Sequence, residues 1–195
     1  MDQQYHFYAL VSRMKTIRRW SLMRNSVTEN VQEHSLMTAV IAHGLCLIKN
    51  TLFGGAVDAN KVATMAMFHD MTEVFTGDMP TPVKYYNPEI SKAYKQIESV
   101  AKEKILGRLP QELTAAYRDV LNMQDTDEYE KRIIRAADKI TAYIKCVEEQ
   151  HSGNTEFDKA KLSLKKTIDG FTDMPEVTYF MQRFMNAFGL TLDEI

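Results

Sequence analysis

The sequence has little cysteine, glycine or proline. Only two cysteines, 8 glycines and 5 prolines occur among 195 residues, and Cys46 and Cys146 belong to no CxxC pair. This spacing argues against a disulfide framework and against a thiolate zinc knuckle. The sequence also lacks internal repeats, low-complexity tracts and a Gly/Ser-rich linker. We therefore expect one domain that spans residues 1–195.

Long apolar runs and an excess of charge of one sign are also missing. No segment approaches the roughly 20 apolar residues of a membrane span, and MDQQYHFYALVSRMK lacks the pattern of a signal peptide. The net charge of −2 gives no general basic field that would attract a nucleic-acid polymer. A small anionic ligand needs only a local basic pocket. We expect a cytoplasmic protein without a membrane or nucleic-acid partner.

The sequence does contain helical patterning. No stretch shows the strict alternation of a half-buried strand over several residues, and glycine and proline separate helical patterns rather than hairpins. The patterns predict an all-α, single-domain fold. The expected helices lie at roughly 4–18, 29–50, 58–76, 88–107, 110–123, 127–150, 155–170 and 175–188.

Several helix ends carry capping signals. Asn30 and Glu33 have the spacing of a capping box at the start of the second helix, and Thr28 is a competing cap. Asp58 fits the N-cap of the third helix, and Gly77 fits the position just after its end.

Four residues have the chemistry of metal ligands: His34, His69, Asp70 and Asp138. Two imidazoles and two carboxylates form a set that one divalent metal accepts while keeping positions open for water and substrate. Taken alone, His34 is better explained as a hydrogen-bonded core histidine, and a His-Asp pair arises by chance in many proteins. The combination favours a metal-dependent hydrolase.

Helical phase tests whether these residues face the core, at about 100° per residue. His34 begins an apolar stripe, whereas His43 lies on the opposite face, toward solvent or a partner. In the third helix His69 and Glu73 share a face with apolar residues, and Asp70 is rotated from it. Glu73 can therefore overhang whatever His69 and Asp70 bind. The stripe that His34 begins continues with Met37, Ile41, Leu45 and Ile48.

Asp138 points away from the main apolar stripe of its helix. It lies on a second face of small or apolar residues, with Ile134, Thr141 and Ala142. A helix that is apolar on two faces is usually central, and a buried carboxylate needs a partner. A metal ion is one such partner. An ion pair with Arg135 or Lys139 is the alternative, and for Asp138 alone it is the better one.

The order H…HD…D on successive helices resembles the HD-domain superfamily of metal-dependent phosphohydrolases. Four longer segments resemble the bacterial 5′-deoxynucleotidases of the YfbR type in order and spacing, over nearly the whole chain. These segments are RRWSLMRN, TENVQEHSL, MFHDMTEVFTGDMPTPVKY and RAADKITAYIKCVEE.

This resemblance implies a role for each matching residue. His34, His69, Asp70 and Asp138 would bind one divalent metal, and Asp70 would also contact the substrate. Arg19 would contact the phosphate and Trp20 the sugar. Glu73 and Asp78 match carboxylates that are associated with catalysis in the family. Arg19 would also take part in catalysis. The remaining substrate contacts would come from the loop Asp78, Met79, Pro80 and Thr81, in which Met79 is a tolerable apolar variation.

The implied reaction is hydrolysis of deoxyribonucleoside 5′-monophosphates by a metal-activated water, with selection against ribonucleotides. Mixed nitrogen and oxygen ligands suit Co²⁺, Mn²⁺, Fe²⁺ or Zn²⁺ better than Ca²⁺, and we expect Co²⁺ to serve in vitro, with Mn²⁺ as another candidate. The planar guanidinium of Arg19 can donate paired hydrogen bonds to two phosphate oxygens. The alternative interpretation is that Arg19 belongs to a solvated basic face. Trp20 would pack against the sugar edge; the alternative is that it is a core or interface anchor. The family also implies a homodimer.

Two other functions compete with this one. An HD-type hydrolase of dNTPs or guanosine tetraphosphate would need several basic residues around the pocket, for which we assign only Arg19 and Lys84. A non-catalytic helical metal-binding module would use the 12 methionines and the segment YFMQRFMNAF as a partner surface. The open ligand set and Glu73 argue against that module. The sequence leaves open the base preference, the native metal, and which of Glu73 and Asp78 donates or accepts a proton.

Overall fold

The computed structural model describes residues 4–84, 86–124 and 126–195. Among these residues the secondary structure is helical, and the one β-pairing is an isolated antiparallel bridge between Arg18 and Asn30. The all-α prediction is confirmed. Tyr85, which ends the third family-like segment, lies outside the described residues. The chain divides into two compact units.

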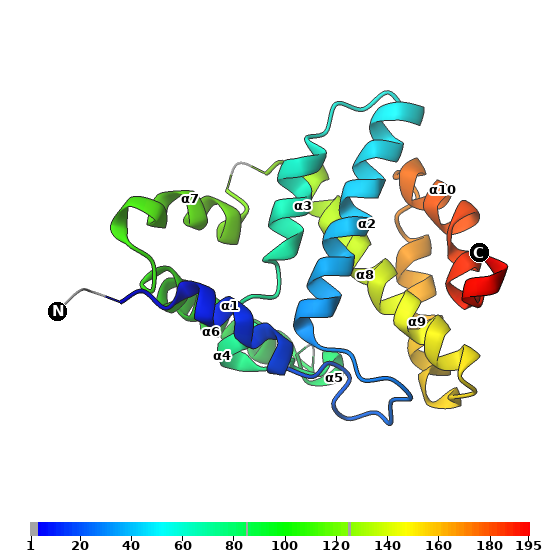
Figure 1. The fold of residues 1–195 in the computed structure, drawn as a ribbon, viewed down its shortest axis with the longest axis horizontal. Helices are drawn as coiled ribbons and strands as arrows, with labels where there is room; N and C mark the ends of the chain where they lie inside the picture. The colour runs from blue at the N-terminus through cyan, green and yellow to red at the C-terminus, as the bar shows by residue number, and fades with distance from the viewer. Residues whose placement is uncertain (1–3, 85, 125) are drawn as a thin grey trace. The chain divides into compact units, whose positions relative to one another are not determined.

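Unit 1 contains the described residues up to Leu22, then Thr28–Ser35, and the described residues from Phe68 to position 124. In Figure 1 α1 lies along α6 and close to α4, and these three helices contact one another. Its helices are α1 (Phe7–Arg13), η1 (Met14–Thr16), α4 (Glu73–Thr76), α5 (Thr81–Lys84), α6 (Pro88–Leu106) and α7 (Gln111–Asn122). Its core consists of Phe7, Met14, Val31, Met71, Ile105, Leu106, Leu109 and Leu121.

Unit 2 contains Met23–Val27, Leu36–Met67 and Thr126–Ile195. Its longest helix is α8, which contacts α3, α9, η2 and η3 and runs beside α9 in Figure 1. A hydrogen bond of 3.3 Å between the hydroxyls of Thr38 and Thr141 joins α2 to α8. The helices are α2 (Val31–Leu52), of which residues 31–35 belong to unit 1, α3 (Ala59–Met67), α8 (Glu128–His151), η2 (Thr155–Phe157), α9 (Asp158–Asp169), α10 (Pro175–Arg183), η3 (Met185–Gly189) and η4 (Leu192–Glu194).

The predicted caps Asn30 and Asp58 are confirmed, and Thr28 is removed as an alternative. Gly77 was predicted to end the helix over 58–76 and instead ends the separate helix α4. Asn30 Oδ1 accepts from the backbone N–H of Glu33 (3.0 Å), and Glu33 Oε2 accepts from the N–H of Asn30 (3.2 Å). This capping box makes Asn30 the cap, not Thr28. Asp58 Oδ1 accepts from the backbone N–H of residue 61 at 3.0 Å. Gly77 ends α4 with φ of 70°, a conformation that glycine adopts without steric cost.

The prediction of one continuous helix over 58–76 is wrong. α3 ends at Met67 and α4 begins at Glu73. Between them the backbone forms three-residue turns, because Met71 N donates to Phe68 O (3.1 Å) and Glu73 N donates to Asp70 O (3.0 Å). Such i−3 bonds are tighter than those of an α-helix. The four-residue helix α5 lies in a segment for which no helix was predicted.

Helix α2 is long and apolar enough, by length and composition, to cross a membrane, with a mean hydropathy of 1.3. This departs from our expectation that no segment approaches a membrane span. Ala42, Leu45 and Cys46 on α2 are fully buried, and the core helix of a soluble protein passes the same test. We assign α2 to the core on this ground. Within its expected stripe, however, Met37 is 39% exposed.

Candidate active site

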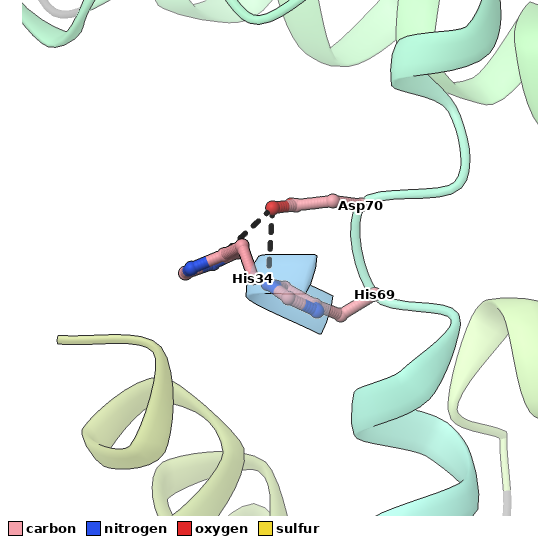
Figure 2. Close-up of side chains that lie close together, drawn as sticks. All are labelled: His34, His69 and Asp70. Atoms are coloured by element: carbon pink, nitrogen blue, oxygen red, sulfur yellow. Dashed lines mark ion pairs between the residues drawn. The ribbon is translucent and has the colours of Figure 1, made fainter. Parts of the chain in front are cut away.

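Three of the predicted metal ligands lie together in unit 1. Oδ2 of Asp70 is 3.1 Å from Nε2 of His69 and 3.6 Å from Nε2 of His34. Figure 2 shows the Asp70 carboxylate directed toward both imidazoles. One ligand atom from each of these residues lies within 4.8 Å of the others. Nitrogen, nitrogen and oxygen at this separation fit one divalent transition metal.

The three side chains of the cluster differ in their exposure to solvent. His34 is inaccessible to solvent, the His69 side chain is 10% exposed and the Asp70 side chain is 21% exposed. Asp70 is therefore the most accessible of the three candidate ligands, and the histidines are the more enclosed ones. A catalytic metal site keeps positions open for water and substrate, and this graded burial meets that requirement.

The turn between α3 and α4 explains how neighbouring residues reach the same point. In a regular helix the side chains of His69 and Asp70 would diverge by about 100°. The tight turn over Phe68–Thr72 instead lets the Asp70 carboxylate approach the His69 imidazole. Asn30, by capping α2, fixes the start of the helix whose first turn carries His34.

Asp138 lies on α8, in unit 2. Its side chain is 24% exposed, and Lys139 Nζ donates to its Oδ2 at 3.0 Å. One of the two ion pairs considered from the sequence is therefore present. The predicted second face is also buried, as shown by Ile134, Thr141 and Ala142. The role of Asp138 as a fourth metal ligand stays a prediction.

Arg19 and Trp20 are fixed beside the cluster in unit 1. Nη1 of Arg19 lies 3.5 Å from Oδ2 of Asp70, and its Nε donates to Oε2 of Glu29 at 3.0 Å. Trp20 Nε1 donates to the same Glu29 oxygen at 3.1 Å. The Arg19 side chain is only 11% exposed. A solvated basic face is therefore the wrong interpretation for Arg19.

The sequence interpretation missed Glu29. This residue lies within TENVQEHSL, one residue before the cap of α2. Neither helical phase nor metal-ligand spacing applies to it, because it lies outside a helix and its partners are side chains nine and ten residues away. The one available signal was an acidic residue in a segment that already resembled the family.

Glu73 is buried at the start of α4, with 8% exposure. Burial, together with the charges of Asp70 and Asp78, raises the pKa of Glu73 to about 9, and Arg19 and Lys84 oppose that rise. Its Oε2 accepts no hydrogen bond within the described residues. Glu73 is therefore a buried carboxyl group with a raised pKa, and within the described residues one of its oxygens accepts no hydrogen bond.

Asp78 and the residues after it form a loop that is tied back to Trp20. Asp78 Oδ2 accepts from the backbone N–H of Trp20 at 3.2 Å. Met79 and Pro80 are half-buried, whereas Thr81 is exposed at the start of α5. Pro80 O accepts from the N–H groups of residues 83 and 84, so α5 begins on this loop.

Lys84, at the end of α5, is held by two residues of α6. Its Nζ donates to Glu98 Oε1 at 3.0 Å and lies 4.5 Å from the centre of the Tyr94 ring. Arg19 and Lys84 are the two positive groups that act on the pKa of Glu73. The site therefore has one guanidinium in contact with Asp70 and one lysine engaged by α6.

Comparison with known proteins identifies close relatives over the full length. A model of the YfbR-like 5′-deoxynucleotidase family matches residues 6–188. A 5′-deoxynucleotidase from Vibrio vulnificus (strain YJ016) is 51% identical over 193 residues and covers 99% of both chains. A 5′-deoxynucleotidase from Yersinia pestis (strain Pestoides F) is 50% identical over 190 residues, with coverage of 97% of this chain and 96% of the relative.

Solved structures agree on the fold. An HD-domain phosphohydrolase from Listeria innocua matches with a TM-score of 0.83 and 24% identity, over 94% of this chain and 88% of that one. The HD phosphohydrolase of cyanophage S-2L, bound to dA and one catalytic Zn²⁺ ion, matches with a TM-score of 0.67 and 17% identity, over 94% and 99%. The family match confirms the resemblance found in the sequence: the chain belongs to the YfbR-like 5′-deoxynucleotidase family and has the HD-domain fold.

Proposed function

We propose that this chain hydrolyses deoxyribonucleoside 5′-monophosphates to deoxyribonucleoside and phosphate, as one functional domain over residues 1–195. The observation that carries the proposal is the position of Asp70, whose Oδ2 contacts both imidazoles and also lies 3.5 Å from the Arg19 guanidinium. A cation site and an anion-binding group are therefore adjacent. The names of the relatives, at about half identity over the full length, support the same reaction.

His34, His69 and Asp70 would hold a divalent metal, with Asp138 as the fourth ligand. When bound, such an ion acidifies a water molecule and neutralises charge on a phosphate oxygen. The two imidazole donors favour a transition metal over Mg²⁺ or Ca²⁺. We expect Co²⁺ to serve in vitro and Mn²⁺ to be an alternative. The Zn²⁺ in the cyanophage structure supports this class of metal.

Arg19 would bind the phosphate. A guanidinium presents paired N–H donors that match two phosphate oxygens, and the partial burial of Arg19 strengthens those bonds. A triphosphate needs more positive charge than one guanidinium supplies. Lys84 is the other cation near Glu73, and Glu98 already engages it. This charge inventory favours a monophosphate over a dNTP or guanosine tetraphosphate.

Glu73 and Asp78 would carry the proton transfers. Glu73 would lose its proton more readily once a cation offsets the charge of Asp70, because nearby positive charge favours the ionised carboxylate. Its undonated Oε2 is then available to a water molecule. Asp78 lies in the loop with Met79, Pro80 and Thr81, which we assign to substrate contacts. Either carboxyl group can serve the attacking water, with the other serving the leaving 5′-oxygen.

Trp20 would select deoxyribose. An indole held beside the phosphate-binding Arg19 can crowd a 2′-hydroxyl and deprive it of hydrogen-bond partners. An apolar wall of this kind rejects an added hydroxyl by only about a hundredfold. The hydrogen bonds from Trp20 to Glu29 and Asp78 support a fixed indole position.

A homodimer in the cytoplasm is the assembly that we propose. Helix α2 carries an exposed apolar face at helical spacing, with Leu36 58%, Val40 59% and Leu47 47% exposed. Gly44 lies between them, and a Cβ there would meet no atom within 4 Å. A helix without side-chain bulk at that point allows close approach of a second copy. Light scattering coupled to size exclusion should give twice the chain mass of 22.4 kDa.

Phosphate release tests the proposed reaction. Metal-stripped protein is given Co²⁺, Mn²⁺ or Mg²⁺ and then dAMP, AMP, dATP or p-nitrophenyl phosphate. Metal-dependent release from dAMP that exceeds release from AMP and dATP, and that is lost in His69→Ala, is the expected result. Cleavage of dATP alone would replace the proposal with a triphosphohydrolase. Bound metal without hydrolysis of any ester would replace it with a non-catalytic metal-binding module.

A further inference from the structure

Glu29 connects two side chains that the proposed reaction assigns to different parts of the substrate. Its Oε2 accepts from Arg19 Nε at 3.0 Å and from Trp20 Nε1 at 3.1 Å. Its backbone carbonyl also accepts from the N–H of Arg19 at 2.9 Å. The Glu29 side chain is 15% exposed, so these bonds are largely protected from water. One carboxylate oxygen therefore fixes the guanidinium and the indole relative to each other.

The backbone conformation of Trp20 indicates that the surrounding contacts hold this residue in place. Trp20 has φ of 55°, in the left-handed region that bulky side chains rarely adopt. A residue keeps such a conformation only where its surroundings over-determine it, and such residues cluster at active sites and ligand clamps. Here the Trp20 N–H is held by Asp78 (3.2 Å) and the indole N–H by Glu29 (3.1 Å).

Arg19 is held from two sides at different nitrogen atoms. Glu29 contacts Nε, whereas Asp70 contacts Nη1 at 3.5 Å. Two carboxylates on different nitrogens fix both the position and the plane of the guanidinium. A long arginine side chain otherwise loses considerable rotamer freedom when it binds an anion. Glu29 therefore restricts the Arg19 side chain in advance, so that less conformational entropy is lost when the anion binds.

We propose that Glu29 is a positioning residue that holds Arg19 and Trp20 as one unit, and so couples binding of the phosphate to selection of the sugar. The inference rests on the proposed function, because it takes Arg19 as the phosphate ligand and Trp20 as the sugar wall. We assign Glu29 contacts with Arg19 and Trp20 and none with the substrate. Its removal should weaken phosphate binding and sugar selection together.

Fluorescence tests the positioning without any turnover. Trp20 is the single tryptophan in the sequence, so intrinsic emission reports on this residue alone. Glu29→Ala should shift the emission to longer wavelength and raise acrylamide quenching about twofold, because the half-buried indole loses the acceptor of its N–H group. Glu33→Gln is the matched control, since Glu33 is an exposed carboxylate whose bond goes to the backbone of Asn30. Unchanged emission and quenching in Glu29→Ala would overturn the proposal.

Kinetics test the coupling. Glu29→Gln keeps the size of the side chain but loses its charge, and it can accept only weakly from two donors. We expect KM for dAMP to rise about tenfold, in line with loss of a charge-assisted hydrogen bond. In the same variant the ratio of kcat/KM for dAMP to kcat/KM for AMP should decrease. In a Trp20→Ala background, Glu29→Gln should leave that ratio unchanged, because coupled residues are not additive.

The outcomes separate the two proposals. Wild-type protein that releases no phosphate from dAMP overturns the proposed function, and the fluorescence result for Glu29 still stands by itself. Wild-type protein that prefers dAMP, with a Glu29→Gln variant of equal KM and equal ratio, overturns the inference alone. Circular dichroism and thermal melting of each variant establish that it is folded. If Glu29→Ala is unfolded, fluorescence and kinetics of Glu29→Gln decide.

Discussion

Nη1 of Arg19 lies 3.5 Å from Oδ2 of Asp70. The carboxylate that contacts both candidate metal-binding imidazoles therefore also contacts the guanidinium that we assign to the phosphate. In this arrangement Asp70 sets the charge of the metal site and the position of Arg19 at once. A substitution at Arg19 changes the substrate side of this pair and keeps all three candidate metal-binding residues.

Arg19→Lys should weaken substrate binding without loss of metal. A lysine provides a point charge and cannot form paired N–H bonds to two phosphate oxygens. We expect KM for dAMP to rise about tenfold or more, which corresponds to roughly 1.5–3 kcal/mol for a hydrogen bond to a charged group. Steady-state kinetics and metal analysis measure the two effects. Arg18→Lys is the matched control, because Arg18 is exposed. An equal KM in both variants would remove Arg19 from phosphate binding.

Glu73→Gln should retain the metal and lose turnover. Glutamine preserves the shape of the buried side chain but cannot exchange a proton, and positioned acid–base groups contribute about 10²- to 10⁴-fold. We therefore expect kcat to fall by that factor while KM and metal content change little. Glu89→Gln, an exposed glutamate on α6, is the control. A wild-type kcat in Glu73→Gln would exclude the residue from proton transfer.

From the sequence, the burial of the site residues could be predicted better than the local backbone conformation. His34 was expected inside and is fully buried, and Glu73 was expected beside the ligands and is 8% exposed. Helical phase accounts for the burial of His34, which lies within α2. For Glu73 the phase argument assumed a continuous helix, which the structure interrupts after Met67. Phase could not reveal the break after Met67, because Met65, His69 and Glu73 keep a helical period across the turn. Hydrogen bonds of the i−3 type, not side-chain pattern, define that break.

Side-chain geometry was the other limit of sequence interpretation. The interaction of Glu29 with Arg19 and Trp20 joins residues outside regular helices, where no period applies. The strained backbone of Trp20 leaves no trace in residue type, since glycine or asparagine is the usual signal for positive φ. For Asp138 the sequence did indicate a partner, either a metal ion or an ion pair with a neighbouring basic residue. The structure contains the ion pair, with Lys139.

Trp20→Ala should relax sugar selection. Removal of the indole takes away the wall that we assign to the 2′ position and leaves room for a hydroxyl. We expect activity on AMP to rise relative to dAMP, with a change in the ratio of up to about a hundredfold. Competition between dAMP and AMP in one reaction measures the ratio directly. If the ratio equals that of the wild type, sugar selection resides elsewhere.

Asp138→Asn should abolish metal binding and activity together, because the amide loses the negative charge of the fourth ligand. Metal analysis after dialysis and phosphate release from dAMP measure the two effects. Lys139→Gln is the matched control: it removes the donor to Asp138 but keeps the carboxylate, so metal should remain bound. If the Asp138→Asn protein keeps its metal and full turnover, Asp138 is not a metal ligand, and its role is the ion pair with Lys139.

Glu149 provides a stability prediction that is independent of the reaction. In unit 2 its side chain is 1% exposed and pairs with Lys145 on α8. It also accepts from Ser26 N at 2.8 Å and from Asn154 Nδ2 at 2.7 Å. Burial raises its pKa, but the hydrogen bonds from these partners outweigh burial and hold the pKa at about 2, below the ordinary value of 4.5.

This shift sets the direction of the pH dependence. Because the pKa is lower in the folded chain than in the unfolded chain, the Glu149 contribution is complete above pH 4.5 and is lost as the pH falls toward 2. Glu149→Gln should lower the free energy of unfolding at pH 7 by about 3–5 kcal/mol, because Lys145 is left as an uncompensated buried charge.

Urea unfolding at pH 7 and pH 3 measures both effects. The Glu149→Gln protein should lose less stability between the two pH values than the wild type, since the titrating carboxylate is gone. Glu148→Gln is the control: this neighbour on α8 is exposed, and a change there should stay within about 0.5 kcal/mol. Equal stability of the Glu149 variant and the wild type at pH 7 would mean that water, not Lys145, compensates the Glu149 charge.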